Sequence, residues 1–228
     1  MIIAIDGPSG AGKSTLGKML AKNLGLLYLD TGAMYRAVGL AVFESGKDFY
    51  DPETVVEIAR HSKIELVGEP EHLQIILNDK NVTGEIRTNE VGQMASIVST
   101  VSEVRKILVE HQRALGQNAP NGCVLDGRDI GSVVFPQADL KFFLTAKPEA
   151  RARRRYEEDL QKEMATTFEE TLAEINLRDR RDVSREDSPL MIAEDAVVID
   201  TSELDLTEVF EQMMSVVRES QNAKSKTF

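Results

Sequence analysis

A glycine-rich run near the start of the chain ends in a lysine and two hydroxyl residues. It spans Gly7 to Thr15 and reads GPSGAGKST, which fits the pattern G-x-x-x-x-G-K-[ST]. In such a loop the glycines let backbone N–H groups approach phosphate oxygens closely. Lys13 would reach the β- and γ-phosphates of a nucleotide, and the hydroxyl of Ser14 could bind Mg²⁺. The run therefore predicts a site for a nucleoside triphosphate, and its order of glycines fits a dinucleotide fingerprint less well.

Two further segments place charged residues directly after short apolar runs. One is Asp30–Arg36, in which Arg36 could clamp a second phosphate group through two hydrogen bonds. The other is Asp126–Gly131, in which Asp126 is placed to orient a metal ion and its waters, and Arg128 and Asp129 would face a cleft. The carboxyl ends of parallel strands meet at one edge of a sheet. Both segments are therefore predicted to lie beside the phosphate loop.

Arginines gather in a third segment, residues 147–185. Arg178, Asp182 and Arg185 are spaced to share one helix face. The whole chain has 27 Lys and Arg against 38 Asp and Glu, a formal charge of −11. So acidic a protein is a poor candidate for non-specific nucleic-acid binding, and we expect neither a nucleic-acid nor a membrane partner. We interpret the segment as a helical lid that closes on phosphates, although a solvated pair of helices with salt bridges is an alternative.

The pattern of hydrophobic residues indicates which elements must position these groups. The run at residues 2–6, the loop and the apolar positions from Leu16 to Leu24 predict a strand, a tight turn and a helix. Further apolar runs at 26–30, 123–126, 140–144 and 196–200 alternate with helical patterns, which is typical of a parallel sheet with helices packed on it. Residues 63–86 interrupt this alternation with a small antiparallel meander whose last strand is expected at VTGEI.

The motifs together resemble the bacterial cytidylate kinases of the nucleoside monophosphate kinase superfamily. The resemblance rests on GPSGAGKST, on LDTGAMYR at 29–36, on Val104-Arg105, on DGRDIGSVVFP at 126–136 and on the RD…D…R pattern at 178–185, and it covers residues 1 to about 218. It implies a three-layer α/β P-loop kinase fold in one domain. The core would comprise residues 1–62, 87–147 and 186–220, the inserted monophosphate-binding region residues 63–86, and the arginine-rich lid residues 148–185.

The resemblance also implies an activity, which is transfer of the γ-phosphoryl group of ATP to CMP or dCMP with Mg²⁺. Thr31, Arg36, Arg128 and Arg185 would surround the acceptor phosphate. Ser96, Arg105 and Asp129 would read cytosine, while Arg178 and Asp182 would contact the ribose. The charge of the transferred group would be neutralised by Lys13, Arg128, Arg178 and Arg185. The residues that would hold ATP are Gly7, Pro8, Ser9, Gly10, Ala11, Gly12, Lys13, Ser14 and Thr15.

Other functions compatible with the phosphate loop stay open at this stage. A P-loop kinase for another small acceptor would carry the same loop, whereas a guanine-nucleotide switch would need an N-K-x-D segment that the sequence lacks. The N-terminus does not resemble a signal peptide and no apolar run approaches the roughly 20 residues of a membrane span, so we expect a cytoplasmic protein. We also expect the protein to be a monomer.

Overall fold

A five-stranded parallel sheet forms the centre of the molecule. The computed structural model describes residues 1–161 and 165–225. The strands β1 (Ile2–Asp6), β2 (Leu27–Asp30), β6 (Cys123–Gly127), β7 (Leu140–Thr145) and β8 (Val197–Asp200) lie in the order β2-β6-β1-β7-β8. Each neighbouring pair is parallel, with Asp6 beside Gly127 and Asp30 beside Asp126. The strand ends that carry the predicted site residues therefore meet at one edge.

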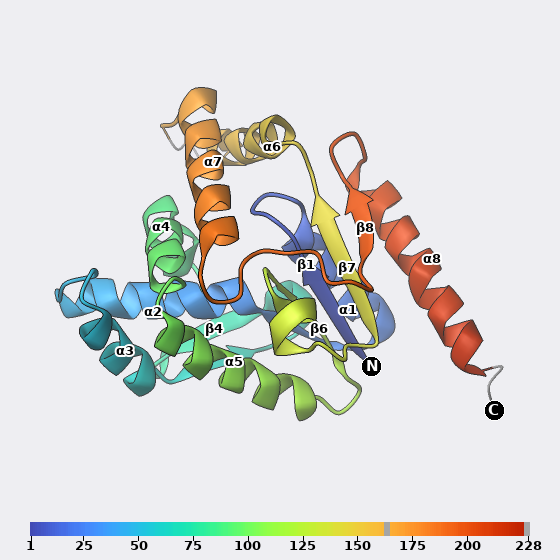
Figure 1. Cartoon of the computed structure of the whole chain (residues 1–228), viewed down its shortest axis with the longest axis horizontal. Coiled ribbons are helices and arrows are strands. Elements are labelled where there is room, and N and C mark those ends of the chain that lie inside the picture. The colour runs from blue at the N-terminus through green and yellow to red at the C-terminus, as the bar shows by residue number, and fades with distance from the viewer. Residues whose placement is uncertain (162–164, 226–228) are drawn as a thin grey trace.

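Helices cover both faces of this sheet because its strands are apolar on both sides. On one face Ile3 and Ile5 pack with α1 (Lys13–Leu24) and α8 (Leu206–Ser225). On the other, Ala4 and Leu125 pack with α5 (Ser102–Gln117) and with the π-helical segment η3 (Ile130–Val134). The predicted three-layer α/β architecture is confirmed. In Figure 1 the ends of β7 and β8 point toward the top of the view, where the loop before α1 also lies.

A second layer of helices flanks the core beside β2. It comprises α2 (Thr31–Ser45), α3 (Pro52–His61) and α4 (Asn89–Val98), and α2 and α4 are in extensive contact. Gly39 permits this packing, because a Cβ there would lie 3.1 Å from the backbone nitrogen of Ala95. The break that separates α4 from α5 falls at residues 99–101.

The meander at residues 63–86 is present, but its last strand was predicted in the wrong place. The three strands are β3 (Ile64–Val67), β4 (Gln74–Leu77) and β5 (Lys80–Asn81). A tight turn at Asn78 and Asp79, both with positive φ, starts β5 two residues earlier than expected. All of VTGEI (82–86) lies outside a strand, and a short 3₁₀ turn occupies Glu85–Arg87.

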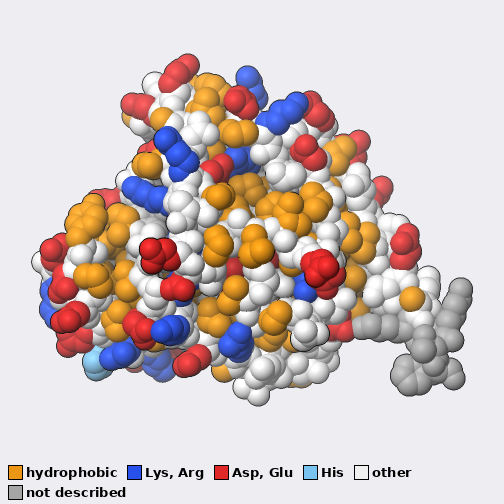
Figure 2. All heavy atoms as spheres, viewed as in Figure 1, with side chains coloured by type: hydrophobic (Ala, Val, Ile, Leu, Met, Phe, Trp, Pro, Cys, Tyr) orange, Lys and Arg blue, Asp and Glu red, His pale blue; other side chains and the backbone are white. Residues whose placement is uncertain are grey.

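Two helices of the predicted lid segment project beyond the carboxyl edge of the sheet. They are α6 (Pro148–Gln161) and α7 (Phe168–Ser184), and they pack against each other (Figure 1). A capping box starts α7, with the Thr167 hydroxyl accepting from the Glu170 amide and the Glu170 carboxylate accepting from the Thr167 amide. Acidic and basic side chains are interspersed on these helices in Figure 2.

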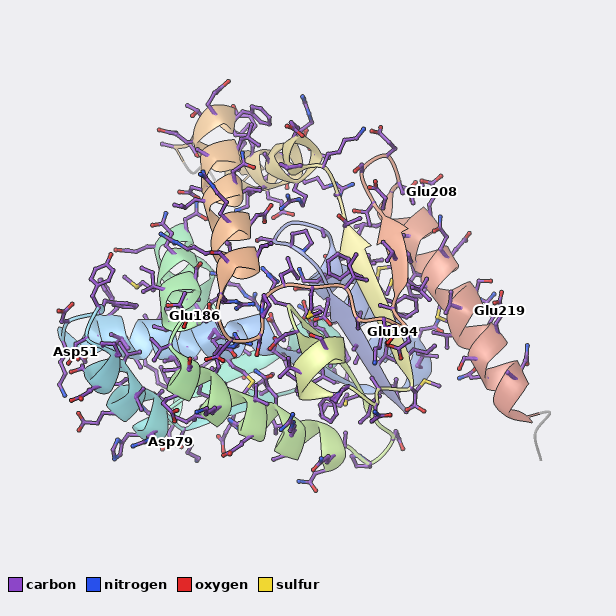
Figure 3. The ribbon with its side chains drawn as sticks, in the orientation of Figure 1. Asp51, Asp79, Glu186, Glu194, Glu208 and Glu219 are labelled. Atoms are coloured by element: carbon purple, nitrogen blue, oxygen red, sulfur yellow. The ribbon has the colours of Figure 1, made fainter. Side chains whose placement is uncertain are left out.

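Charge elsewhere is dispersed, and the single cysteine is buried. Figure 3 labels six carboxylates that are spread along the chain, from Asp51 before α3 to Glu208 and Glu219, which both lie on α8. Cys123 begins β6 with its Sγ 3.7 Å from the Gly116 carbonyl oxygen, and burial raises its pKa to about 11. Within the described residues, no helix combines the length and the hydropathy needed to cross a bilayer.

Candidate active site

The phosphate loop connects β1 to α1 and depends on glycine at both ends. Gly7 has φ +145°, and a Cβ at this position would lie 2.0 Å from the carbonyl oxygen of Leu144. Gly12 has φ +88° and precedes the first helical residue, Lys13. The Nζ of Lys13 curls over the loop and donates to the Pro8 carbonyl at 2.6 Å. Burial and then Arg128 lower the pKa of Lys13 well below its ordinary value, so this ammonium group gains from an anionic partner.

A carboxylate stands directly beside the hydroxyl of Ser14. The Asp126 Oδ2 accepts from the Ser14 Oγ at 2.7 Å, and its Oδ1 accepts from the buried Tyr28 hydroxyl at 3.0 Å. Burial, followed by the nearby Asp30 carboxylate, raises the pKa of Asp126 to about 6. Hydroxyl and carboxylate oxygens are hard ligands that suit Mg²⁺, which takes its other ligands from water and phosphate. The donor set formed by Ser14 and Asp126 therefore fits this ion.

Asp6 fixes the loop that carries Arg128 and Asp129. Its two carboxylate oxygens accept from the backbone amides of Ile130 and Gly131 at 2.8 and 2.7 Å. Burial raises the pKa of Asp6 to about 6, although these two hydrogen bonds act in the opposite direction. Because Asp6 is the last residue of β1, it ties the central strand to the start of η3. Asp6 was not among the predicted site residues, although it ends the apolar run at residues 2–6.

We expect Asp6→Asn to lower the free energy of unfolding by about 1–3 kcal/mol, because the amide has only one acceptor oxygen for two buried N–H groups. The apparent affinity for the acceptor nucleotide should fall as well, since Arg128 and Asp129 precede these amides. Urea denaturation and steady-state kinetics measure the two effects. Glu211→Gln on the exposed surface of α8 is the matched control. A variant as stable as its control would remove Asp6 from this role.

A group of arginines forms a basic region next to α2. Arg36 donates to the carbonyl oxygens of Ile86 and Thr88 at 2.7 and 3.2 Å. Burial, with Arg87 as the largest electrostatic contribution, lowers the pKa of Arg36 to about 10. Arg87 itself forms an ion pair with Asp30 at 2.8 Å. Arg87 was not among the predicted site residues. Its position directly after the meander was the only sequence signal that could have identified it.

Thr31 and the first turn of α2 are held against β6. The Thr31 hydroxyl donates to the Asp126 carbonyl at 2.6 Å. The Asp30 carboxylate caps α2 by accepting from the Ala33 amide at 2.8 Å. These contacts place the predicted acceptor residue Thr31 beside the strand that carries Asp126.

Asp182 of α7 links two of the predicted phosphate-binding arginines. Its Oδ2 is 2.7 Å from the Nε of Arg128, and its Oδ1 is 4.0 Å from the Nη1 of Arg185. Burial alone would raise the pKa of Asp182, but Arg128 and Arg178 hold it below its usual value. The lid helix is thereby joined to the loop after β6.

Arg178 lies one turn before Asp182 and has unused hydrogen-bonding capacity. Its Nε is buried and has no hydrogen-bond partner within the described part of the chain. Burial and the neighbouring Arg128 lower the pKa of Arg178 to about 9. A buried guanidinium group with an unpaired N–H is costly unless an anion satisfies it, so Arg178 is prepared to bind one.

A second buried ion pair lies between α5 and the loop after β6. Arg105 donates to the Oδ2 of Asp129, and both side chains are almost fully buried. The guanidinium group lies 5.6 Å from the ring centre of Tyr35. The Nε of Arg105 and the Oγ of Ser96 are buried without partners among the residues described. Two of the three residues predicted to read a base, Ser96 and Arg105, therefore retain polar atoms that a ligand could satisfy.

A small cavity of about 50 Å³ connects several of these groups. Its lining includes Ser9 of the phosphate loop, Arg36, Ser96 and Arg178. A larger cavity of about 430 Å³ lies between α2, α3 and the small sheet, and its lining includes none of the predicted site residues. The smaller cavity is the relevant one, because it brings donor-side, acceptor-side and lid residues together.

Comparisons with known proteins match this chain over almost its whole length. The family model described as cytidylate kinase matches residues 3–219. A cytidylate kinase of Caldanaerobacter subterraneus subsp. tengcongensis is 49% identical over 218 residues, which cover 96% of this chain and 95% of that protein. One from Geobacter sp. (strain M21) is 48% identical, covering 96% and 93%. A solved structure of an uncharacterised protein from Eubacterium ventriosum has a TM-score of 0.50 at 12% identity, covering 96% and 98%, which concerns the fold alone.

Proposed function

Because the chain belongs to the cytidylate kinase family, we propose that it transfers the γ-phosphoryl group of ATP to CMP or dCMP. The products are ADP and CDP or dCDP. The observation that carries this proposal is the proximity of a phosphate loop, a group of buried arginines and the Arg105–Asp129 pair at one edge of the sheet. Residues 7–15 bind the phosphates of ATP, and the arginines bind the acceptor.

In this assignment Thr31, Arg36, Arg128 and Arg185 surround the phosphate of the acceptor nucleotide. Arg178 and Asp182 contact its ribose, and Arg178 also neutralises charge on the transferred group. Support comes from the short chain of contacts from Arg128 through Asp182 to Arg185, and from the unpaired Nε of Arg178. Arg87 and Arg155 add positive charge near Arg36.

Ser14 and Asp126 would hold Mg²⁺, the first through its hydroxyl and the second directly or through water. When bound, the ion neutralises charge on the ATP phosphates and orients them. The residues of this chain do the remaining work. The main obstacle to the reaction is the repulsion between two anionic groups. Lys13 and the arginines neutralise this charge and hold the two groups in line. The acceptor oxygen is already ionised near neutral pH, so no side chain is required as a base.

Asp129 and Arg105 would select the base by hydrogen bonding. The Asp129 carboxylate can accept from the exocyclic N4 amino group of cytosine, and Arg105 can donate to its N3 and O2 atoms. Uracil would place a carbonyl oxygen against the carboxylate. The resulting unpaired buried groups cost about 1–3 kcal/mol.

The acceptor range provides the direct test. With ATP and Mg²⁺ we expect rapid ADP formation with CMP and dCMP. Rates with UMP should be about fivefold to a hundredfold lower, as a penalty of about 1–3 kcal/mol requires, and AMP should also be a poor acceptor. Coupled measurement of ADP, with nucleotide diphosphates identified by chromatography, gives the rates. Preference for AMP, or for an acceptor that is not a nucleotide, would contradict the proposal.

All residues of the proposed site come from one chain, and we propose that the protein acts as a cytoplasmic monomer. Sedimentation velocity at enzyme concentrations used for kinetics measures the oligomeric state. A dimer whose dissociation abolishes turnover would contradict this part of the proposal.

A further inference from the structure

Arg151 of α6 is buried, with 2% of its surface exposed, and its side chain contacts three segments of the chain. Its Nε donates to the Ala146 carbonyl at 2.9 Å, and its Nη1 donates to the Ser9 carbonyl of the phosphate loop at 3.0 Å. Its Nη1 and Nη2 also donate to the two carboxylate oxygens of Asp179 on α7, at 3.1 and 2.6 Å. One guanidinium group thus joins the end of β7, the phosphate loop and the second lid helix.

A glycine in the phosphate loop permits the loop to approach α6 closely beside Arg151. Gly10 of the phosphate loop has φ +78°, and a Cβ at this position would lie 3.2 Å from the Cβ of Arg151. A side chain at residue 10 would therefore force the loop and α6 apart. The contact depends on the backbone of both elements as well as on charge.

The hydrogen bonds leave Arg151 little capacity for phosphate. A guanidinium group has five N–H donors, and the bonds described above occupy four of them with protein acceptors. Arg178 is partly exposed as a whole residue, but its Nε is buried and has no hydrogen-bond partner within the described residues. The two lid arginines therefore differ in role, although the sequence alone does not separate them.

Asp179 connects Arg151 to three residues that we propose bind the acceptor nucleotide, Arg128, Arg178 and Asp182. It follows Arg178 directly and precedes Asp182 by one helical turn. Holding Asp179 against Arg151 consequently fixes the turn of α7 that presents Arg178 and Asp182, and Asp182 in turn contacts Arg128. The position of these acceptor-binding residues is thereby linked, through Arg151, to the carbonyl oxygen of Ser9.

We propose that Arg151 and Asp179 are a pair of positioning residues that align the lid helix α7 with the phosphate loop. This inference rests on the function proposed above and extends it. Loss of the pair leaves each substrate able to bind but misaligns donor and acceptor. Transfer to the nucleotide then slows, and water attacks the γ-phosphorus of ATP in its place, giving ADP and inorganic phosphate.

The experiment compares Asp179→Asn and Arg151→Lys with the unaltered protein. Asparagine keeps the shape of aspartate, and lysine keeps the charge of arginine, but both remove the paired hydrogen bonds. We expect kcat for CDP formation to fall about tenfold to hundredfold, as for misaligned reactants. The dissociation constant of MgATP, measured by equilibrium titration without acceptor, should change less than about threefold, because Arg151 donates to protein acceptors rather than to phosphate. The ratio of ADP to CDP formed should rise above one.

Matched variants separate alignment from general damage. Arg153→Lys on α6 and Glu186→Gln after α7 alter exposed residues and should retain the kinetics of the unaltered protein. Asp179→Glu restores a carboxylate and should recover most of the lost kcat. Thermal unfolding of each variant verifies that the fold is retained.

Three results would overturn the inference. The first is a normal kcat and a normal ADP-to-CDP ratio in both primary variants. The second is a large loss of MgATP affinity in Arg151→Lys with kcat unchanged, which would make Arg151 a phosphate ligand. The third is failure of Asp179→Glu to recover activity while its thermal stability is normal. Failure of the proposed function itself is recognised separately, because the unaltered protein would then form no CDP from CMP.

Discussion

Lys13→Ala is expected to lower kcat by at least about a thousandfold, because it removes the cation that we propose contacts the transferred phosphoryl group. The fold should survive. Burial lowers the pKa of Lys13, with Arg128 adding to the effect, so the charged form is disfavoured in the folded state. Its removal therefore leaves thermal stability unchanged or higher. Alanine is also a good helix former at the first position of α1.

Steady-state ADP production and a thermal unfolding curve test both parts of this prediction. Lys22→Ala is the control, because Lys22 lies on the same helix and pairs with Glu71 at the exposed surface. If Lys13→Ala turned over within a few-fold of the control, the assignment of residues 7–15 to ATP phosphates would be wrong.

Asp129→Ala is expected to reduce kcat/KM for CMP about a hundredfold while kcat/KM for UMP falls much less. The reason is that alanine removes the carboxylate that we propose accepts from the cytosine amino group, and leaves the buried Arg105 without its ion-pair partner. The preference for CMP over UMP should narrow accordingly. Asp129→Asn should narrow it further, because its amide NH₂ can donate to the O4 atom of uracil.

Parallel kinetics with CMP and UMP at saturating ATP measure the ratio for each variant. Glu103→Gln, an exposed substitution on the same helix as Arg105, is the control. An unchanged ratio in both Asp129 variants would remove this residue from base recognition.

The central sheet and the phosphate loop were predictable because their signals are local. The strand at Ile2–Asp6, the glycines of the loop and the apolar positions of α1 follow one another without interruption. Parallel strands then bring Asp30, Asp126 and the loop to one edge, as the sequence indicated. The grouping of Arg128, Asp182 and Arg185 was predicted as well, partly from helical spacing and partly from resemblance.

Other features were missed for different reasons, some local and some dependent on partners far away in the sequence. The helix α3 (Pro52–His61) was not predicted, although Asp51 and Pro52 form an ordinary helix start. The strand at Lys80–Asn81 was taken for a turn, because two polar residues become a strand only when β4 offers a paired edge. Asp6, Arg87 and the pairing of Arg151 with Asp179 are defined by contacts with other elements, so composition and spacing say nothing about them.

The buried position of Cys123 has a practical consequence for observing the lid. Because this thiol is the only one in the sequence and its pKa is about 11, maleimide reagents should leave it unmodified at neutral pH. A pair of fluorophores can therefore be attached to cysteines introduced by Glu53→Cys on α3 and Arg180→Cys on α7, with no need to remove the native residue. Energy transfer between the dyes would then report opening and closing in single molecules during turnover.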